Sequence, residues 1–127
     1  NLRPRLTIDA ELRPEEVTLV SAEHLNQLEP HGLGNPKPIF VIRNAVVVEN
    51  RVIGSTKQHL KLELLVGDQQ AVGAVAFGMA ARKAEVEPGQ RLDIACLLDI
   101  NEWQNRRTVQ LKVMDWRQAG SADEDEE

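Results

Sequence analysis

Aromatic residues are scarce in this chain of 127 residues. They make up 3% of the sequence and comprise Phe40, Phe77, Trp103 and Trp116, with no tyrosine. Proteins that hold single-stranded nucleic acid without sequence preference commonly stack the bases on aromatic rings. The scarcity excludes an extended stacking surface and leaves at most a few stacking positions.

The sequence also has a single cysteine and lacks any long apolar run. Cys96 cannot form an internal disulfide bond, which favours a reducing compartment. No stretch approaches the roughly 20 apolar residues of a transmembrane helix, and no apolar segment typical of a signal peptide follows residues 1–5. We expect a cytoplasmic chain without membrane contact. The absence of an initiator methionine predicts a piece of a longer protein.

Charge is unevenly divided along the chain. The formal charge is −5, with 20 acidic residues against 15 Lys and Arg, but five of the acidic residues are the last five of the chain. Without them the two signs balance, which excludes the overall basic charge of many nucleic-acid-binding domains. Any DNA contact must therefore use a local cationic patch. Residues 118–127 are expected to form a disordered acidic tail, or else to fold back over such a patch and compete with phosphate.

Residues 1–38 predict an arm, a helix and an elbow that lead into the rest of the chain. Alternation in Leu6–Ile8 indicates a strand or extended arm, and Pro14 followed by two glutamates is typical of a helix start. Apolar residues at helical spacing predict a helix over about 15–28 with one buried face. That face comprises Val17, Val20 or Ser21, Leu25 and Leu28. Pro30 ends the helix, because the residue before a proline is forced out of the α conformation.

Residues 30–38 contain three prolines and two glycines, which exclude a helix or a central strand. The segment is predicted to be a structural elbow. Its Gly32-Leu33-Gly34 sequence is a weak indication of phosphate binding, because a dinucleotide fingerprint needs a strand before it and a helix after it. Here the order is reversed.

From Ile39 the hydrophobic period changes from 3.6 residues to 2, which predicts strands. A turn at residues 67–69 makes the second and third strands a hairpin, and residues 79–85 have the composition of a short helix. Residues 101–107 are expected to form the loop before the last strand. The five predicted strands cover residues 39–49, 59–66, 70–77, 92–98 and 109–113.

Alternation along these strands predicts which side chains are buried. The first strand is expected to place Phe40, Ile42, Val46 and Val48 on one face. The second should direct Leu60, Leu62 and Leu64 inward and His59, Lys61 and Glu63 outward. Leu62, Val75, Ile94 and Leu111 are predicted core residues. Cys96 has inward parity and is expected to be a buried, inert thiol.

The order strand, strand, strand, short helix, strand, strand is that of a five-stranded Greek-key barrel, the OB-fold. SH3-like barrels also have five strands, but they usually lack the helix between the third and fourth. We therefore predict a mostly β protein with an OB-fold barrel over residues 39–117.

Several segments resemble the RecJ family of bacterial single-strand-specific DNA exonucleases. Residues 28–40 (LEPHGLGNPKPIF) are similar to the family signature LEPFGxGNPxPxF, which stands at the entry to an OB domain. Other similar segments follow in the family's order over roughly residues 6–116. They are Gly54 with residues 57–62, residues 76–78, Pro88-Gly89 with Leu92-Asp93, residues 101–105 and residues 109–111. Two positions depart from the pattern: His31 replaces a usual aromatic, and Arg106 stands near a usual glycine.

The resemblance implies more than this chain contains. RecJ enzymes are DHH phosphoesterases, hydrolases that cut DNA with two divalent metal ions, Mn²⁺ or Mg²⁺, held by aspartates and histidines. No Asp-His-His motif is present, and His24, His31 and His59 are scattered. We therefore expect no catalytic residue, metal ligand or cofactor in this chain. The resemblance implies a non-catalytic nucleic-acid-binding module of a RecJ-like 5′–3′ exonuclease in DNA repair and recombination.

Two roles stay open for such a module. It could hold single-stranded DNA for the catalytic core of the same polypeptide, or it could be a docking module that closes the nuclease ring or binds a partner such as single-stranded-DNA-binding protein. The candidate DNA contacts lie on the predicted second strand, on the last strand, and in the loops where OB-folds commonly bind single strands. They are Arg51, Lys57, His59, Lys61, Trp103, Arg106, Arg107 and Lys112. The alternative is that these cations are solubilising surface charges and that Trp103 packs across its own hairpin.

Overall fold

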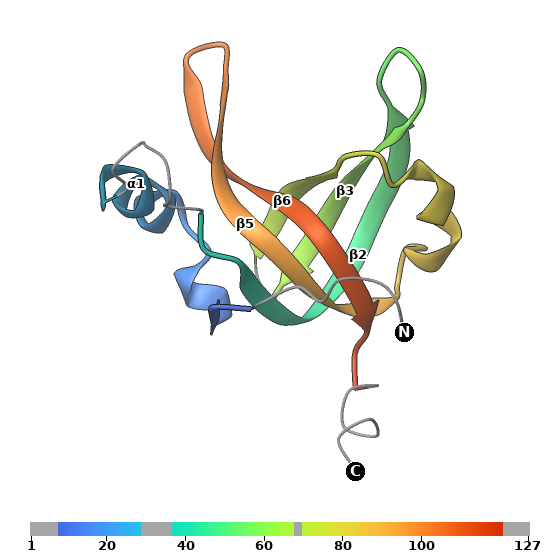
Figure 1. The fold of residues 1–127 in the computed structure, drawn as a ribbon, viewed down its shortest axis with the longest axis horizontal. Helices are drawn as coiled ribbons and strands as arrows, with labels where there is room; N and C mark the ends of the chain where they lie inside the picture. The colour runs from blue at the N-terminus through green and yellow to red at the C-terminus, as the bar shows by residue number, and fades with distance from the viewer. Residues whose placement is uncertain (1–7, 29–36, 68–69, 121–127) are drawn as a thin grey trace.

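A computed structural model describes residues 8–28, 37–67 and 70–120, and its strands form one sheet that curls into a barrel (Figure 1). A short β1, a 3₁₀ turn η1 and a helix α1 precede the barrel strands, and a second 3₁₀ segment η2 lies between β4 and β5. The bounds are β1 Ala10–Glu11, η1 Pro14–Glu16, α1 Leu19–Leu28, β2 Phe40–Ile53, β3 His59–Val66, β4 Gln70–Ala76, η2 Ala80–Glu85, β5 Arg91–Trp103 and β6 Arg106–Gln118. The predicted elbow, residues 30–38, and the predicted acidic tail lie mostly outside the described residues.

The sheet closes because β2 has two partners within the barrel. The strand order is β1-β2-β3-β4-β6-β5, and β2 also pairs with β5. The β2–β3, β3–β4, β5–β6 and β2–β5 pairs are antiparallel, whereas β4 and β6 are parallel. Together with η2 between the third and fourth barrel strands, this is the arrangement of an OB-fold. The predicted fold class is confirmed.

The hairpin of β3 and β4 matches the prediction from alternation. Leu60, Leu62 and Leu64 are at most 1% exposed, and Leu62 pairs with Ala74 of β4. The adjoining turn at Gly67 has a φ of +69°, in the region that glycine tolerates best. Strict period-2 alternation with a glycine turn therefore located both strands.

The predicted inward face of β2 is wrong beyond Ile42. Val48 is 48% exposed, while Ala45 and Val47 are buried instead. The register with β5 shifts between Ile42 and Ala45, and Asn44 has a φ of +60°. Such a bulge adds one residue to the strand and so reverses which face the following side chains occupy. The strand also continues to Ile53, past the predicted end at residue 49.

The N-terminal helix is shorter than predicted. Residues 14–16 form a single 3₁₀ turn, and the α-helix begins at Leu19. The Thr18 hydroxyl accepts a hydrogen bond from the Ser21 backbone N–H (3.1 Å), which is a typical helix start. Val20 of the predicted buried face is 63% exposed, whereas Val17 and Ala22 are buried. The 3₁₀ turn breaks the helical phase, so the spacing counted from Val17 does not continue into α1.

The predicted loop over residues 101–107 is replaced by a tight hairpin. β5 extends to Trp103 and β6 begins at Arg106, and these two residues pair directly. The connecting Gln104 and Asn105 have φ values of 51° and 64°. Two successive positive φ angles are typical of a type I′ turn, whose twist matches the flanking strands. The hairpin of β5–β6 and the β2–β3 turn project from the same end of the barrel (Figure 1).

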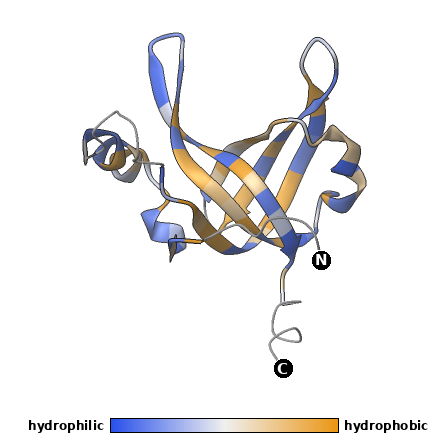
Figure 2. Cartoon of the chain, in the orientation of Figure 1, coloured by the Kyte–Doolittle hydropathy of each residue, from blue (hydrophilic) through white to orange (hydrophobic). Residues whose placement is uncertain are grey.

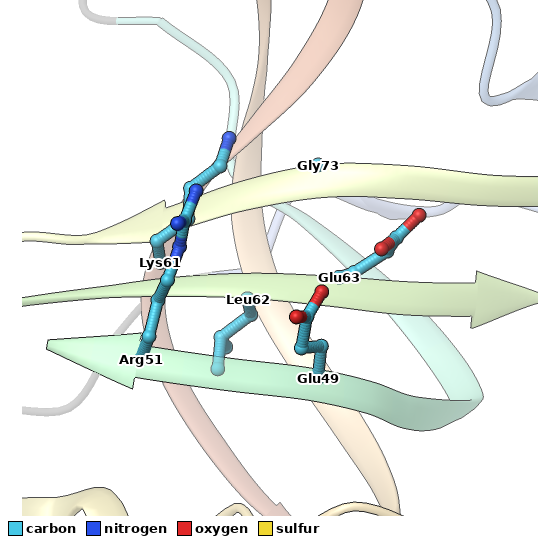
Figure 3. A pocket seen from close by; sticks show the side chains of 6 residues that line it. All are labelled: Glu49, Arg51, Lys61, Leu62, Glu63 and Gly73. Atoms are coloured by element: carbon cyan, nitrogen blue, oxygen red, sulfur yellow. The ribbon is translucent and has the colours of Figure 1, made fainter.

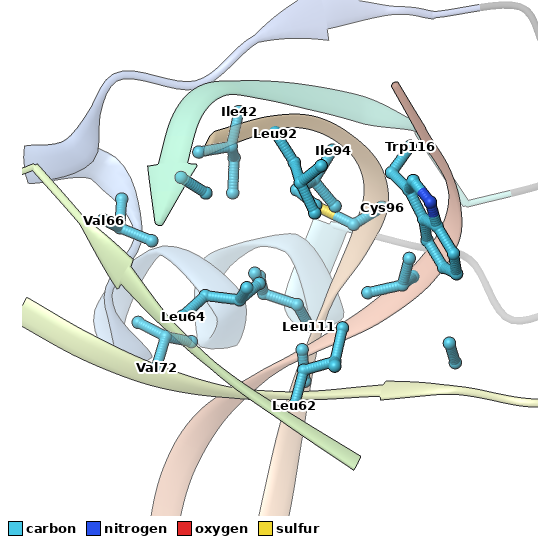
Figure 4. Close-up of a cluster of buried hydrophobic side chains, with 14 of the residues drawn as sticks. Ile42, Leu62, Leu64, Val66, Val72, Leu92, Ile94, Cys96, Leu111 and Trp116 are labelled. Atoms are coloured by element: carbon cyan, nitrogen blue, oxygen red, sulfur yellow. The ribbon is translucent and has the colours of Figure 1, made fainter. Parts of the chain in front are cut away.

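The barrel interior holds one apolar cluster, to which every barrel strand contributes (Figures 2 and 4). The four predicted core residues are buried: Leu62, Ile94 and Leu111 belong to this cluster and are at most 1% exposed, whereas Val75 is 8% exposed and lies outside the cluster. Cys96 is also fully buried, and desolvation raises the pKa of its thiol to about 12. This thiol is protonated at neutral pH, as expected for an inert cysteine.

Candidate nucleic-acid interface

Three of the candidate cations form a row across the outer face of the barrel. In the register of the strands, Arg51 of β2 pairs with Lys61 of β3, Lys61 with Val75 of β4, and Val75 with Lys112 of β6. We call Arg51, Lys61 and Lys112 the cationic row. Because Leu60 and Leu62 point inward, Lys61 must point outward.

Val75 lies in the middle of this row and belongs to the outer face. Its neighbours along β4, Ala74 and Ala76, are in the interior cluster, yet Val75 is only 8% exposed. The residues that flank it across the sheet are Lys61 and Lys112. Lysine stems cover apolar surface while their ammonium groups stay in water. The two lysines are therefore part of the packing as well as charges.

Like charges face each other at the end of the row (Figure 3). Arg51 lies opposite Lys61, and Glu49 lies opposite Glu63. These four residues line a shallow pocket of about 250 Å³ together with Gly73. Like charges directly opposite on paired strands repel each other. Among the described residues Arg51 and Lys61 form no ion pair, so an anion placed between them would relieve their repulsion.

Gly73 leaves room for the Lys61 ammonium. A Cβ at this glycine would lie 3.1 Å from Lys61 Nζ. Lys61 and Gly73 also line a second, open groove of about 460 Å³, which runs toward the stem of the β5–β6 hairpin and is bordered there by Arg107, Thr108 and Gln110. Lys61 therefore joins the pocket of the cationic row to the groove beneath the hairpin.

Acidic side chains lie beside the cationic row, two residues along the strands. Glu49 pairs with Glu63, Glu63 with Gly73, Gly73 with Gln110, and Gln110 with Asp99. Two residues of a strand span about 7 Å. A phosphate chain on this face would be attracted to the cationic row and repelled from Glu49, Glu63 and Asp99.

The candidates of the β5–β6 hairpin are in two different situations. Arg107 forms ion pairs with Glu23 of α1 (3.2 Å) and with Glu102 (3.6 Å), so its guanidinium is already neutralised. Trp103 and Arg106 lie at the tip, where the Trp103 side chain is 67% exposed. Lys112 is six positions beyond Arg106 on β6, which is roughly 20 Å along a strand. The tip is therefore at a distance from the cationic row.

The His59 ring has its own structural contacts. The backbone N–H of Gly78 donates a hydrogen bond to His59 Nδ1 (2.8 Å), and a Cβ at Gly54 would lie 3.0 Å from the ring. The ring also contacts Phe77 edge-on, with centroids 5.2 Å apart. Lys57 stands in the adjoining turn, where its N–H bonds to the Gly54 carbonyl and its side chain is exposed. His59 positions its neighbours, whereas Lys57 is free to reach a ligand.

Phe77 is a candidate that the sequence analysis missed. It follows the last residue of β4, it is 56% exposed, and Lys112 Nζ lies over its ring, 5.8 Å from the centroid. The signal was present, because alternation that buries Ala74 and Ala76 directs residue 77 outward.

Neither a metal site nor a membrane span is found in the described ranges. No group of three or more His, Cys, Asp or Glu side chains there is placed to hold a metal ion. None of the helices in these ranges is long and apolar enough to cross a bilayer.

Comparison with known proteins gives one consistent family. Residues 8–115 match the family model described as the RecJ OB domain. The single-stranded-DNA-specific exonuclease RecJ of Bacillus subtilis is 33% identical over 112 residues, which cover 88% of this chain and 14% of that protein. RecJ of Haemophilus influenzae is 34% identical over 107 residues, which cover 83% of this chain and 18% of that protein. The chain thus spans less than a fifth of these relatives.

Solved structures show the same fold. RecJ of Thermus thermophilus in complex with Mn²⁺ superposes with a TM-score of 0.63 at 24% identity, covering 91% of this chain and 16% of that one. The second single-stranded-DNA-binding protein of Mycobacterium smegmatis superposes with a TM-score of 0.53 at 15% identity, covering 66% of this chain and 88% of that one. The T. thermophilus enzyme was also solved with Mg²⁺. The described residues of the present chain offer no ligand cluster that fits either ion.

Proposed function

The chain belongs to the RecJ OB domain family, and from this membership we propose that it is the single-stranded-DNA-binding module of a RecJ-like exonuclease. Its curated relatives are named single-stranded-DNA-specific exonucleases, and it spans 14% to 18% of their length. In this proposal the chain binds the strand and does no chemistry. A metal-dependent nuclease core elsewhere in the same polypeptide cuts it.

The cationic row is the observation that carries the proposal. Three cations from three strands form one row, in which Lys61 and Lys112 flank Val75. Arg51 and Lys61 lie opposite each other and have no acidic partner among the described residues. Successive phosphates of a strand that bind at these two side chains replace a repulsion with two attractions. The neighbouring acidic side chains keep the phosphates on one side of the face. No element of this arrangement reads a base edge, so binding should be independent of sequence.

Binding should be weak and strongly dependent on salt. Each phosphate neutralised on a single strand contributes about −0.7 to the slope of log K against log salt concentration. The cationic row with Lys57 and Arg106 offers three to five contacts, which predicts a slope of roughly −2 to −3.5. Arg107 is held in ion pairs with Glu23 and Glu102 and is not counted.

The test is a fluorescence-anisotropy titration of this chain with a labelled oligo-dT at several salt concentrations. Replacing Arg51 and Lys61 together by glutamine should flatten the slope by about 1.4, the share of two phosphates. The matched control replaces Lys83 on η2 and Arg91 at the start of β5 by glutamine, which removes the same charge outside the row. An equal effect of both double variants would refute a localised site.

Docking is the second candidate role, and the same titration separates it. The chain matches less than a fifth of the length of its relatives, in which other segments adjoin the matched part. Absence of binding at low salt, both for the intact chain and after deletion of residues 121–127, would refute the DNA-binding role. It would leave the face to contacts with the nuclease core or with another protein.

A further inference from the structure

We propose that Phe77 is a base-stacking residue, which takes one unpaired base while the cationic row holds the adjoining phosphates. This inference rests on the proposed function and adds the site where the base, as distinct from the backbone, is bound. A module whose only contacts were to phosphate would leave the bases in water. Stacking on an aromatic ring adds affinity for any base, because every base has a π-face.

The Phe77 ring is exposed but held in place. It is 56% exposed, and its centroid lies 5.2 Å from that of His59, with 74° between the ring planes. His59 is itself fixed by the Gly78 N–H and by close approach to Gly54. A stacking ring that is already oriented loses less conformational freedom when a base arrives. The contacts of His59 with Gly54 and Gly78 therefore also orient the Phe77 ring.

The residue that follows Phe77 has no side chain, and there is open space around its Cβ position. Phe77 is followed by Gly78, where an added Cβ would meet no atom within 4 Å apart from those of Gly78 and its two chain neighbours. Gly78 has a φ of +72°, so the chain turns away directly after the phenylalanine. Gly78 therefore adds no side chain next to Phe77 that a base would have to avoid.

Lys112 connects the ring to the phosphate contacts. Its ammonium lies 5.8 Å from the Phe77 centroid, and its strand position is next to Val75 in the cationic row. A cation over an aromatic face is held only weakly at an exposed site. A base can take that place over the ring, while the flexible lysine turns to the phosphate of the same nucleotide. Ring and row would then bind one nucleotide between them.

The charge around the ring favours a nucleotide over an apolar protein partner. An exposed aromatic residue that served a protein contact would be expected within a larger apolar patch. Phe77 is instead bordered by His59 and Lys112, and Val75 beside them is covered. One ring beside the Lys112 ammonium matches one base with its phosphate.

The test compares two oligonucleotides that share a backbone but differ in bases. The affinity of the chain is measured by anisotropy for oligo-dT and for an abasic tetrahydrofuran oligomer of equal length. Phe77→Leu, which keeps an apolar side chain of similar size but removes the ring, should weaken oligo-dT binding about tenfold. The affinity of this variant for the abasic oligomer should stay within twofold of that of the unmodified chain. The slope of log K against log salt concentration should be unchanged. Phe77→Trp should restore oligo-dT binding.

Val20→Ala is the matched control, since Val20 is an apolar side chain of similar exposure (63%) on α1. It should leave both affinities unchanged. A second readout is photocrosslinking of an oligomer that carries 5-iodouracil, which should attach to Phe77 and be located by mass spectrometry.

The outcomes separate this inference from the proposed function. If oligo-dT binds with the expected salt slope but Phe77→Leu does not weaken it, stacking is refuted and the phosphate site stands. Equal losses for oligo-dT and the abasic oligomer would also refute stacking, since the ring would then act through His59 or Lys112. Absence of any binding by the unmodified chain at low salt overturns both.

Discussion

Replacing Lys61 by methionine should separate DNA binding from folding stability. The substitution removes one charge from the cationic row but keeps an unbranched side chain that can continue to cover Val75. We expect weaker binding to single-stranded DNA with almost no change in the free energy of unfolding. Within the folded chain, the repulsions and attractions between Lys61 and its charged neighbours nearly cancel. The attraction between Lys61 and a bound phosphate is not cancelled in this way.

The balance follows from the positions on the sheet. Arg51 lies opposite Lys61 and Lys112 lies two strands away, while Glu63 is two residues along the same strand and Glu49 is diagonal to it. Unit charges roughly 5 to 10 Å apart in water interact by about 0.4 to 0.8 kcal/mol. Two repulsions and two attractions of this size cancel to within about 0.5 kcal/mol.

The effect on binding is larger because one attraction is lost outright. A phosphate about 4 Å from the ammonium gains about 1 kcal/mol in water, which corresponds to about fivefold in affinity at low salt. The salt slope should flatten by about 0.7. Anisotropy titrations give the affinity and slope, and urea unfolding gives the stability, with Lys83→Met as the charge-matched control. Unchanged affinity in a stably folded Lys61→Met variant would refute the assignment of Lys61 to the phosphate site.

Three further predictions concern the fold. Leu62→Ala should lower the free energy of unfolding by about 2–5 kcal/mol in urea, since the side chain is 1% exposed in the barrel core. Cys96, with a thiol pKa raised to about 12 by burial, should not react with a thiol reagent in the native state at pH 8 and should react fully in urea. The hydrogen bond from Arg82 lowers the pKa of Glu85 below its ordinary 4.5, so its stabilising contribution is present above pH 4.5 and is lost as the pH falls through the lowered pKa. Glu85→Gln should therefore destabilise the chain at pH 7 and have little effect at pH 2; an equal effect at both would contradict this.

Sequence patterns located the β3–β4 hairpin because its determinants are local. Alternation of Leu60, Leu62 and Leu64 sets the face, and Gly67 sets the turn. The bulge in β2 has a distant determinant. Asp93 of β5 accepts a hydrogen bond from the Asn44 N–H (3.1 Å) and forms an ion pair with Arg43. No pattern within β2 contains that information, so the face of Val46 and Val48 was predicted wrongly.

The candidate site likewise combines features that local sequence determines with features that depend on distant segments. The outward direction of Lys61 follows from alternation, but its place beside Arg51 and near Lys112 depends on the register of four strands. The pairing of Arg107 with Glu23 depends on how α1 packs against the hairpin, which local sequence does not specify. Phe77 ends the predicted strand over residues 70–77 and was within reach of the alternation rule, but the rule was not applied to the outward residues of that strand.

The pairings that build the cationic row differ in how far they reach along the chain. Arg51 and Lys61 belong to one hairpin, which can form early because a short loop closes quickly. Lys112 joins them only through the parallel pairing of β4 with β6, whose strands are separated by η2 and all of β5. Contacts between distant segments form late and slow the folding of barrels. A nascent or partly folded chain would present two of the three cations, and the complete row would arise with the last steps of folding.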